Sequence, residues 1–272
     1  MTDRHAHVSA PSAIAQGSMC CPAPGQVAFV GAGPGNAELL TLKALKALQA
    51  ADVILHDRLV SGEVLELAGE QAALENVGKE GFGAQVSQDE INARLVAHAQ
   101  SGKRVVRLKA GDPAIFARLD EEITALEAAN LPYVIVPGIT AASAAVASIG
   151  QSLTQRGRNT SVRFVTGHDM KGFADQDWAA LARPGEVAAV YMGKKSARFI
   201  QGRMLMHGAE RATPVTVLEN ASRADQRVLE TTLGHLADDL AAAAFDGPAL
   251  TFLGLAPRKA AAALTDLKME LA

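Results

Sequence analysis

The sequence predicts an α/β protein built from two lobes, and three observations support this fold class. A short apolar strand, residues 27–30, runs directly into a glycine-rich loop, residues 31–35, and a helical leucine pattern follows. Predicted strands and helices then alternate through the first half of the chain, which is typical of βαβ units around a mostly parallel sheet. A second series of strands and helices begins after about residue 160, so we expect a second α/β lobe and a hinge near residues 140–150.

Composition and charge restrict the class of protein. The chain has 272 residues, of which 49% are apolar, enough for one large or two modest packed domains. With 26 basic and 29 acidic residues the net charge is −3, which gives no general argument for nucleic acid or a membrane surface. No apolar run approaches the length of a bilayer span. We therefore expect neither a nucleic-acid partner nor a membrane partner.

The first residues of the chain differ from the rest. Residues 1–24 contain Pro, Ser and Ala without periodicity, and they lack the basic start and continuous apolar core of a secretory signal. The two cysteines, Cys20 and Cys21, are adjacent in this segment, so no disulfide framework is implied. We expect a disordered tail over 1–24, an N-terminal domain over 25–143, a C-terminal domain over 144–272, and a cytoplasmic location.

The elements of the first lobe follow from apolar runs and capping residues. Leucines at a spacing of three between Leu39 and Leu48 predict a helix over 38–50. Ser87 stands three residues before Glu90, which is typical of a capping box at the start of a helix. Thr140 is a candidate cap for an alanine-rich helix. Further strands are predicted over 51–58, 74–79, 103–109 and 133–138, with a helix at about 120–129.

The second lobe is predicted in the same way. Apolar runs indicate strands over 161–168, 186–193, 213–220, 226–232 and 249–254, and helices at about 196–207 and 235–244. No long helix separates the strands over 213–220 and 226–232. Because a short connection joins antiparallel neighbours, these two strands should form a hairpin.

The glycine loop near the front of the chain leaves two interpretations open. Gly31 and Gly33 match the start of a dinucleotide-binding pattern. Asp57 follows them at about the sequence separation at which that pattern has an acidic residue for a ribose hydroxyl. The third glycine of that pattern falls at Asn36, and Pro34 removes a backbone N–H that a pyrophosphate would need. The loop is therefore either a nucleotide-type binding loop or a tight turn without a ligand.

Several polar and small residues follow predicted strands of the first lobe. In a parallel sheet the carboxyl ends of the strands meet at one edge, where ligands of open α/β folds bind. We expect this edge to collect the following residues: Gly31–Gly35, Asp57, Lys79, Gly111, Asp112 and Gly138–Thr140. The histidines, in contrast, are scattered without metal-ligand spacing, so we expect no metal site.

A series of motifs in one order resembles the uroporphyrinogen-III C-methyltransferase family. The opening VGAGPGNAELLTLKALKALQAADVILHDRLV is similar to the start of that family, and the resemblance spans roughly residues 26–256. The motifs that continue it are VGK at 77–79, GKRVVRLKAGDPAIFAR at 102–118, VPGITAASAA at 136–145, LTQRG at 153–157, FVTGH at 164–168 and YMG at 191–193. The resemblance implies two α/β lobes with S-adenosylmethionine in the cleft between them, and a homodimer.

The resemblance also implies which residues contact the cofactor. They come from the glycine loop, the turn after the strand at 103–109, the segment after VPGI, the YMG motif and a backbone contact near residue 221. These residues are Pro34, Ala110, Gly111, Asp112, Ile115, Thr140, Ala141, Met192 and Ala221. Asp112 is suited to accept a hydrogen bond from a ribose hydroxyl, and small residues allow close backbone approach. Taken singly, Asp112-Pro113 also fits an ordinary turn and Met192 ordinary core packing.

The substrate implied by the resemblance is a small-molecule tetrapyrrole with many carboxylates, which arginine binds well. Arg118, Glu121 and Arg156 match family positions tied to substrate and catalysis, whereas Arg58 and Arg158 are weaker candidates. Asp57 is implied as proton acceptor and Lys79 as proton donor. The implied reaction methylates uroporphyrinogen III at C2 and C7, which gives precorrin-2 and S-adenosylhomocysteine, on the way to sirohaem, cobalamin or haem d1.

The sequence departs from the family mainly on the substrate side. Ala110 stands where a second glycine is usual, residues 117–121 read ARLDE in place of GRGGE, and Gln151, Ser152 and Gln155 replace usual residues. The segment 81–83 is less basic than is usual after Lys79. A different tetrapyrrole, or a modified protein residue as in diphthine synthase, is therefore an alternative substrate. A nicotinamide-dependent oxidoreductase and a binding module without turnover are alternatives of other classes.

Overall fold

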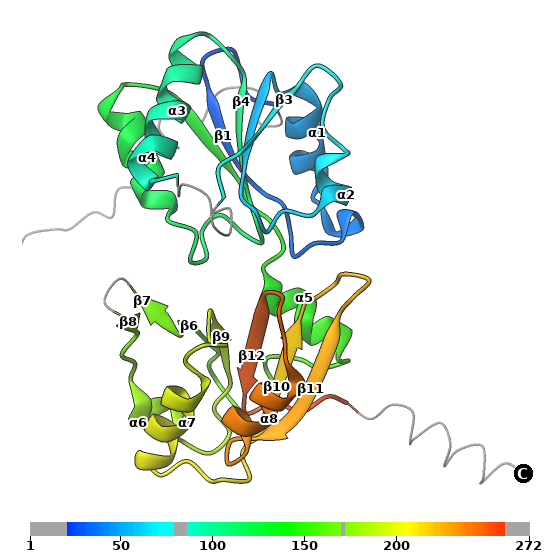
Figure 1. Cartoon of the computed structure of the whole chain (residues 1–272), viewed down its shortest axis with the longest axis vertical. Helices are drawn as coiled ribbons and strands as arrows, with labels where there is room; N and C mark the ends of the chain where they lie inside the picture. Colours follow the sequence, from blue (N-terminus) through cyan, green and yellow to red (C-terminus); the bar gives the residue numbers. More distant parts are fainter. Residues whose placement is uncertain (1–20, 79–85, 170–171, 259–272) are drawn as a thin grey trace, which may run out of the picture. The chain divides into compact units, whose positions relative to one another are not determined.

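The computed structural model describes residues 21–78, 86–169 and 172–258 (Figure 1). The chain divides into two compact units between Ile139 and Thr140, and each is described by itself. Within the described ranges, no helix has the length and apolar character that crossing a membrane requires.

The first unit contains a parallel sheet, as the alternation of strands and helices predicts. Every strand pair in it is parallel, and the order is β3-β2-β4-β1-β5. All strand carboxyl ends therefore lie at one edge. The strands are β1 (Val27–Gly31), β2 (Val53–His56), β3 (Ala73–Asn76), β4 (Val105–Lys109) and β5 (Tyr133–Val136).

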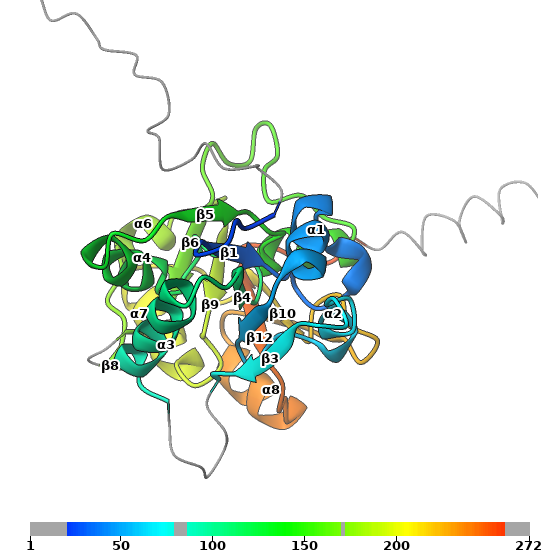
Figure 2. The ribbon, with the colours of Figure 1, turned by 90° about the horizontal axis from the view of Figure 1, so that it is seen from above.

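Helices cover both faces of this sheet (Figure 2). On one face, α1 and α2 pack against Ala28, Ile54 and Val106, and on the other α3 and α4 pack against Phe29 and Leu55. Because side chains alternate along a strand, the odd-numbered residues of β4 face α3 and α4. The helices are α1 (Leu42–Ala50), α2 (Gly62–Leu65), α3 (Gln88–Gln100) and α4 (Leu119–Ala128).

Capping decides where the first helices begin. The stretch predicted as one helix over 38–50 is instead a 3₁₀ turn (Ala37–Leu39) followed by α1. The Thr41 hydroxyl accepts a hydrogen bond from the Ala44 N–H at 3.1 Å and so starts α1 anew. At α3 the predicted cap by Ser87 is confirmed, since the Ser87 hydroxyl accepts from the Glu90 N–H at 3.1 Å. The Glu90 carboxylate, which would complete a capping box, instead accepts from Arg94 at 2.5 Å.

The second unit contains a mixed sheet in the order β11-β10-β12-β9-β6. The pair of β10 and β11 is antiparallel, which confirms the predicted hairpin, and β12 runs antiparallel to both β10 and β9. A small two-stranded sheet, β7 (His168–Asp169) with β8 (Gly172–Phe173), is separate. The main strands are β6 (Arg163–Thr166), β9 (Ala188–Tyr191), β10 (Pro214–Glu219), β11 (Arg227–Thr232) and β12 (Ala249–Leu253).

The second sheet also has a helix layer on each face. Helix α5 packs with Ala189, Leu218 and Phe252 on one face, and α6, α7 and α8 pack with Val190 and Val217 on the other. Each unit therefore has its own hydrophobic core. The helices are α5 (Ala141–Ser148), α6 (Trp178–Leu181), α7 (Ala197–Met206) and α8 (Leu236–Ala243).

Candidate functional site

The carboxyl edge of the first sheet carries most of the residues that the sequence singles out. The loop after β1 and the loop after β4 are joined by backbone hydrogen bonds. Gly33 and Gly111 bond each other in both directions, at 3.1 and 2.7 Å, and the Ala32 N–H donates to the Lys109 carbonyl at 2.8 Å. These two loops therefore form one continuous backbone surface beyond the strand ends.

Glycine is required where this surface meets the end of β5. A Cβ atom added to Gly31 would lie 2.6 Å from Gly138 Cα and 2.7 Å from the Gly111 carbonyl oxygen, both backbone atoms. Gly111 has a φ of +72°, which favours glycine for a second reason. Ala110 does not have a positive φ, so the methyl group at this position is tolerated.

The Asp112 carboxylate fastens the neighbouring loops together. One oxygen accepts from the Ala114 N–H at 2.8 Å and the other from the Gly138 N–H at 3.0 Å. Asp112 therefore has the structural role in a turn that the sequence allowed. Binding of a ribose hydroxyl by Asp112 stays a prediction. Pro34 and Ile115 are half-buried in the same joined loops.

Arg118 and Glu121 form a forked ion pair at the start of α4. Arg118 Nε and Nη2 donate to the two carboxylate oxygens of Glu121 at 2.7 and 2.6 Å. The Arg118 guanidinium lowers the pKa of the Glu121 carboxyl, and Glu121 raises the pKa of Arg118. Arg118 has a φ of 55°, a left-handed conformation that is uncommon for arginine and is often found at functional sites.

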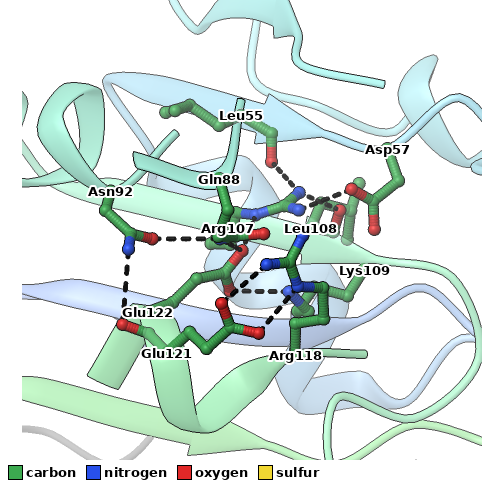
Figure 3. A network of polar contacts seen from close by, with 10 residues as sticks. All are labelled: Leu55, Asp57, Gln88, Asn92, Arg107, Leu108, Lys109, Arg118, Glu121 and Glu122. Atoms are coloured by element: carbon green, nitrogen blue, oxygen red, sulfur yellow. Dashed lines mark hydrogen bonds and ion pairs between the residues drawn. The ribbon is translucent and has the colours of Figure 1, made fainter. Parts of the chain in front are cut away.

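Behind this edge lies a buried ion-pair network, of which the sequence singled out only Asp57 (Figure 3). Arg107 donates to Asp57 at 2.5 Å and to Glu122 at 2.9 Å, and Lys109 donates to the second oxygen of Glu122 at 2.6 Å. Glu122 is fully buried, and Arg107 and Lys109 nearly so. Removing one partner from a buried pair costs about 3–5 kcal/mol, so these residues depend on one another.

Burial and neighbouring charges act on the two basic groups differently. Burial alone would lower the pKa of Arg107, but the charges of Asp57 and Glu122 outweigh it and raise that pKa. For Lys109, burial and the charge of Arg107 outweigh Glu122, so the pKa of Lys109 is lowered. The alternating basic residues 107 and 109 on a predicted buried strand were the signal that could have revealed the network.

In the second unit, the start of α5 is tied to the end of β9. The Thr140 and Tyr191 hydroxyls are hydrogen bonded to each other, and the Ala142 N–H donates to the Tyr191 hydroxyl at 3.2 Å. Thr140 occupies the position before the helix, but its side chain makes no capping bond, so the predicted cap is wrong in that respect. The Tyr191 hydroxyl takes that role because it bonds both Thr140 and Ala142.

Met192 and Ala221 follow β9 and β10, which run in the same direction because both are antiparallel to β12. They therefore lie at the same edge of the second sheet. Met192 has a φ of 54° and is 52% exposed, so it is not an ordinary core residue. Ala221 is buried, and Asn220 before it also has a positive φ of 52°. Thr140, Ala141 and Met192 are brought together through Tyr191.

The remaining predicted residues are not brought into these groups. Arg156 is exposed on the loop after α5, and Arg58 is exposed after β2. Arg158 donates to the carbonyls of Ser152 and Leu153 at 2.9 and 3.2 Å, which is a structural role in its own loop. Lys79 and residues 81–83 lie outside the described residues. No group of three or more His, Cys, Asp or Glu side chains in the described ranges could hold a metal ion.

Comparison with known proteins agrees with the ordered motifs. Residues 26–237 match the family of tetrapyrrole (corrin/porphyrin) methylases. Siroheme synthase 1 of Yersinia enterocolitica is 48% identical over 230 residues, which are 85% of this chain and 48% of that protein. Siroheme synthase of Pseudoalteromonas translucida is 45% identical over 230 residues, 85% of this chain and 49% of that protein. The chain thus spans about half the length of these relatives.

Solved structures show the same fold over nearly their whole length. Uroporphyrin-III C-methyl transferase from Thermus thermophilus, complexed with S-adenyl homocysteine, matches with a TM-score of 0.72 at 36% identity. The match covers 84% of this chain and 97% of that one. Cobalt precorrin-4 methyltransferase matches with a TM-score of 0.75 at 25% identity, over 85% and 95% of the two chains. On this evidence, the chain belongs to the tetrapyrrole (corrin/porphyrin) methylases.

Proposed function

We propose that this protein is an S-adenosylmethionine-dependent uroporphyrinogen-III C-methyltransferase that adds methyl groups at C2 and C7 to give precorrin-2. The observation that carries this proposal is the match to the Thermus thermophilus enzyme, which covers 97% of that chain at 36% identity. The joined backbone loops beyond the strand ends of the first unit support the proposal, because ligands of open α/β folds bind at this edge of the sheet. The same match, to a protein complexed with S-adenyl homocysteine, supports the choice of methyl donor.

The residues present fit such a donor. Pro34, Ala110 and Gly111 are half-buried in the loops after β1 and β4. Glycine keeps these loops close together, because an added Cβ at Gly31 or Gly138 would collide with backbone atoms. We assign donor binding to the predicted set of Pro34, Ala110, Gly111, Asp112, Ile115, Thr140, Ala141, Met192 and Ala221. When bound, S-adenosylmethionine supplies an electrophilic methyl group on its sulfonium. The chain positions the reacting carbon in line with it and excludes water.

Side chains of the protein bind the substrate carboxylates and transfer the proton. Arg118, with Glu121 beside it, and Arg156 carry the charge that pairs with acetate and propionate groups. A proton must leave the methylated macrocycle to restore conjugation, and Asp57 at the end of β2 is the proposed acceptor. Lys79 is the proposed proton donor. Two successive transfers release two molecules of S-adenosylhomocysteine.

A different tetrapyrrole is the alternative substrate. One feature of the proposed substrate-binding segment supports this alternative. Asp120 adds a negative charge between Arg118 and Glu121, in the segment where the sequence departs from the family. The fold match to cobalt precorrin-4 methyltransferase, at 25% identity, shows that this architecture also acts in cobalamin synthesis. The siroheme synthases are about twice as long as the match, so the pathway branch served by this chain is a proposal. A homodimer in the cytoplasm, with no nucleic-acid partner, completes the proposal.

Calorimetric titration with S-adenosylhomocysteine and, separately, NAD is the first test. Micromolar binding of S-adenosylhomocysteine alone, about −8 kcal/mol, supports the methyltransferase, whereas binding of NAD alone contradicts it. Uroporphyrinogen III and labelled S-adenosylmethionine should then give a product with two labelled methyl groups. Transfer only to another precorrin would favour the alternative substrate, and binding without any transfer would identify a binding module.

A further inference from the structure

The proposed reaction leaves open why an arginine is buried in the middle of β4. Arg107 is 3% exposed, and its donors are satisfied on three sides. Nε bonds Glu122, Nη1 bonds the carbonyls of Leu55 and Leu108, and Nη2 bonds Asp57 (Figure 3). The guanidinium is planar and has few ways to meet all these acceptors at once. Its orientation is therefore fixed by the interior of the first unit.

The two carboxylates that Arg107 joins differ in their surroundings. Glu122 is held from several sides, because Lys109 donates to one oxygen at 2.6 Å and Gln88 to the other at 3.3 Å. The Asp57 side chain is 32% exposed at the strand end, and Arg107 bonds only its Oδ1. Among the described residues, none hydrogen bonds Asp57 Oδ2. The network thus fixes one oxygen of Asp57 and leaves the other available.

We propose that Arg107 is a positioning residue for Asp57, and that Arg107 is itself oriented by Glu122 and Lys109. The inference rests on the proposed function, since it takes Asp57 as the acceptor of the proton that leaves the methylated macrocycle. In that step the C–H bond breaks, its electron pair returns to the conjugated system, and the proton forms an O–H bond to Asp57. Arg107 holds the carboxylate so that its second oxygen faces the substrate side of the edge.

A matched control exists at the opposite ends of the same two strands. Arg104, just before β4, forms a forked pair with Asp52, just before β2, with Nη2 to Oδ1 at 2.6 Å and Nε to Oδ2 at 3.1 Å. This pair joins the same strands as Arg107 and Asp57, but it lies at the amino edge, away from the strand-end loops. Arg104→Met therefore measures the effect on kcat of breaking an ion pair between β2 and β4 that lies away from the proposed site.

The test is a double-mutant cycle with Arg107→Met and Asp57→Asn, measured on methyl transfer to uroporphyrinogen III. Arg107→Met should lower kcat about 10- to 100-fold. This loss is smaller than the whole rate enhancement of about 10²- to 10⁴-fold that a positioned acid–base group contributes, because Asp57 itself remains. KM for both substrates should stay unchanged, and Arg107→Lys should restore part of kcat. The deuterium isotope effect at the carbon that loses the proton should rise. The double variant should be no slower than Asp57→Asn alone, and Arg104→Met should keep the wild-type kcat.

Losses that multiply in the double variant, or an equal fall in kcat for Arg104→Met, would overturn the proposal. If Arg107→Met fails to fold, Glu122→Gln takes its place, because it keeps the pair of Arg107 and Asp57 while weakening its anchor. That variant should lower kcat at an unchanged affinity for S-adenosylhomocysteine, and an unchanged kcat would contradict the anchoring role.

A failure of the proposed function gives a different result. In that case the wild-type protein transfers no methyl group to uroporphyrinogen III. The same cycle of variants, measured as free energies of unfolding, needs no substrate and should still show coupling between Arg107 and Asp57. Zero coupling would mean that the pair does not exist in solution, and the positioning role would fall with it.

Discussion

Arg118 combines a strained backbone with an exposed ion pair, which favours a binding role over a stabilising one. Its left-handed conformation, with a φ of 55°, costs about 1 kcal/mol, and α4 begins there without a side-chain cap. The side chains of Arg118 and Glu121 are 55% and 49% exposed, so their pair contributes little to stability. A position that is costly for the fold and exposes charge is well placed to meet a carboxylate.

Replacing this arginine should therefore affect the substrate and spare the methyl donor. We expect Arg118→Met to raise KM for uroporphyrinogen III at least about tenfold, since a hydrogen bond to a charged group contributes about 1.5–3 kcal/mol. The affinity for S-adenosylhomocysteine should not change, which titration calorimetry measures. Arg94→Met is the control, because Arg94 forms a similar surface pair with Glu90 on α3. A comparable loss in both variants would contradict the binding role.

Gly31 tests the close approach of the strand-end loops. In Gly31→Ala the new methyl would lie 2.6 Å from Gly138 Cα, so backbone must move. Overpacking of this kind costs about 1–3 kcal/mol, and the shifted loops should also bind S-adenosylhomocysteine more weakly. Gly62→Ala is the matched substitution, because no atom lies within 4 Å of its added Cβ. Thermal unfolding measures the stability of both variants, and calorimetry measures their affinity for S-adenosylhomocysteine. Equal stability and equal affinity in the two variants would show that the close contact at Gly31 is dispensable.

At this scale the sequence located the residues of the strand-end loops, and it missed the charged residues of the interior. Gly111 and Asp112 were singled out by their place directly after a predicted strand, and they lie in the loop after β4, where an ordinary turn also favours these residue types. Arg107 and Lys109 were missed because a basic residue in a strand pattern is usually solvent-facing, and Glu122 was missed because an acidic residue in a helix pattern usually is too. The structure shows that residues 107 and 109 of β4 are buried on the side of the sheet that faces α4.

Among the elements, β2 and β4 are joined at their starts by the ion pair of Asp52 and Arg104. Hydrogen bonds from the Arg104 side chain, and then from its backbone N–H, lower the pKa of Asp52 from 3.8 to about 2. Because the folded pKa lies below the ordinary value, the pair stabilises the fold above about pH 4. That contribution is lost as the pH falls through about 2.

Asp52→Asn should therefore lower the unfolding temperature at pH 7 and pH 5 by the same amount. The difference from wild type should shrink below about pH 4 and vanish near pH 2, where Asp52 itself becomes protonated. Asp238→Asn serves as the control, because the side chains of its pair with Arg198 are largely exposed. Thermal scans followed by circular dichroism at several pH values measure this, and a pH-independent difference would argue against the ion pair.

The elements that the sequence did not predict are short and depend on tertiary contacts. The two-residue strands β7 and β8 and the single-turn helices α2 and α6 have no periodicity to detect. The split before α1 was missed because leucine spacing continued across Leu40 and Thr41, while the hydroxyl of Thr41 started a new helix. The hairpin of β10 and β11 was predictable because connection length alone decides it.

For the whole molecule, the two units have separate cores and differently built sheets, one parallel and one mixed. The sequence predicted two α/β lobes, since both series of elements were visible in it. It did not show that the second sheet is largely antiparallel, because the partners of β12 are set by long-range pairing. The proposed donor contacts nonetheless come from both units, with Pro34 to Ile115 in the first and Thr140 to Ala221 in the second.

This distribution gives a prediction for the unfolding of the full chain. Separate cores should unfold in two calorimetric transitions in the absence of ligand. If both units supply contacts to S-adenosylhomocysteine, a concentration 100 times its Kd should stabilise the bound chain by about 2.7 kcal/mol. Both transitions should then move to higher temperature and merge, while NAD at the same concentration should move neither. A shift confined to one transition would assign the donor contacts to a single unit and remove the other unit's residues from the proposed site.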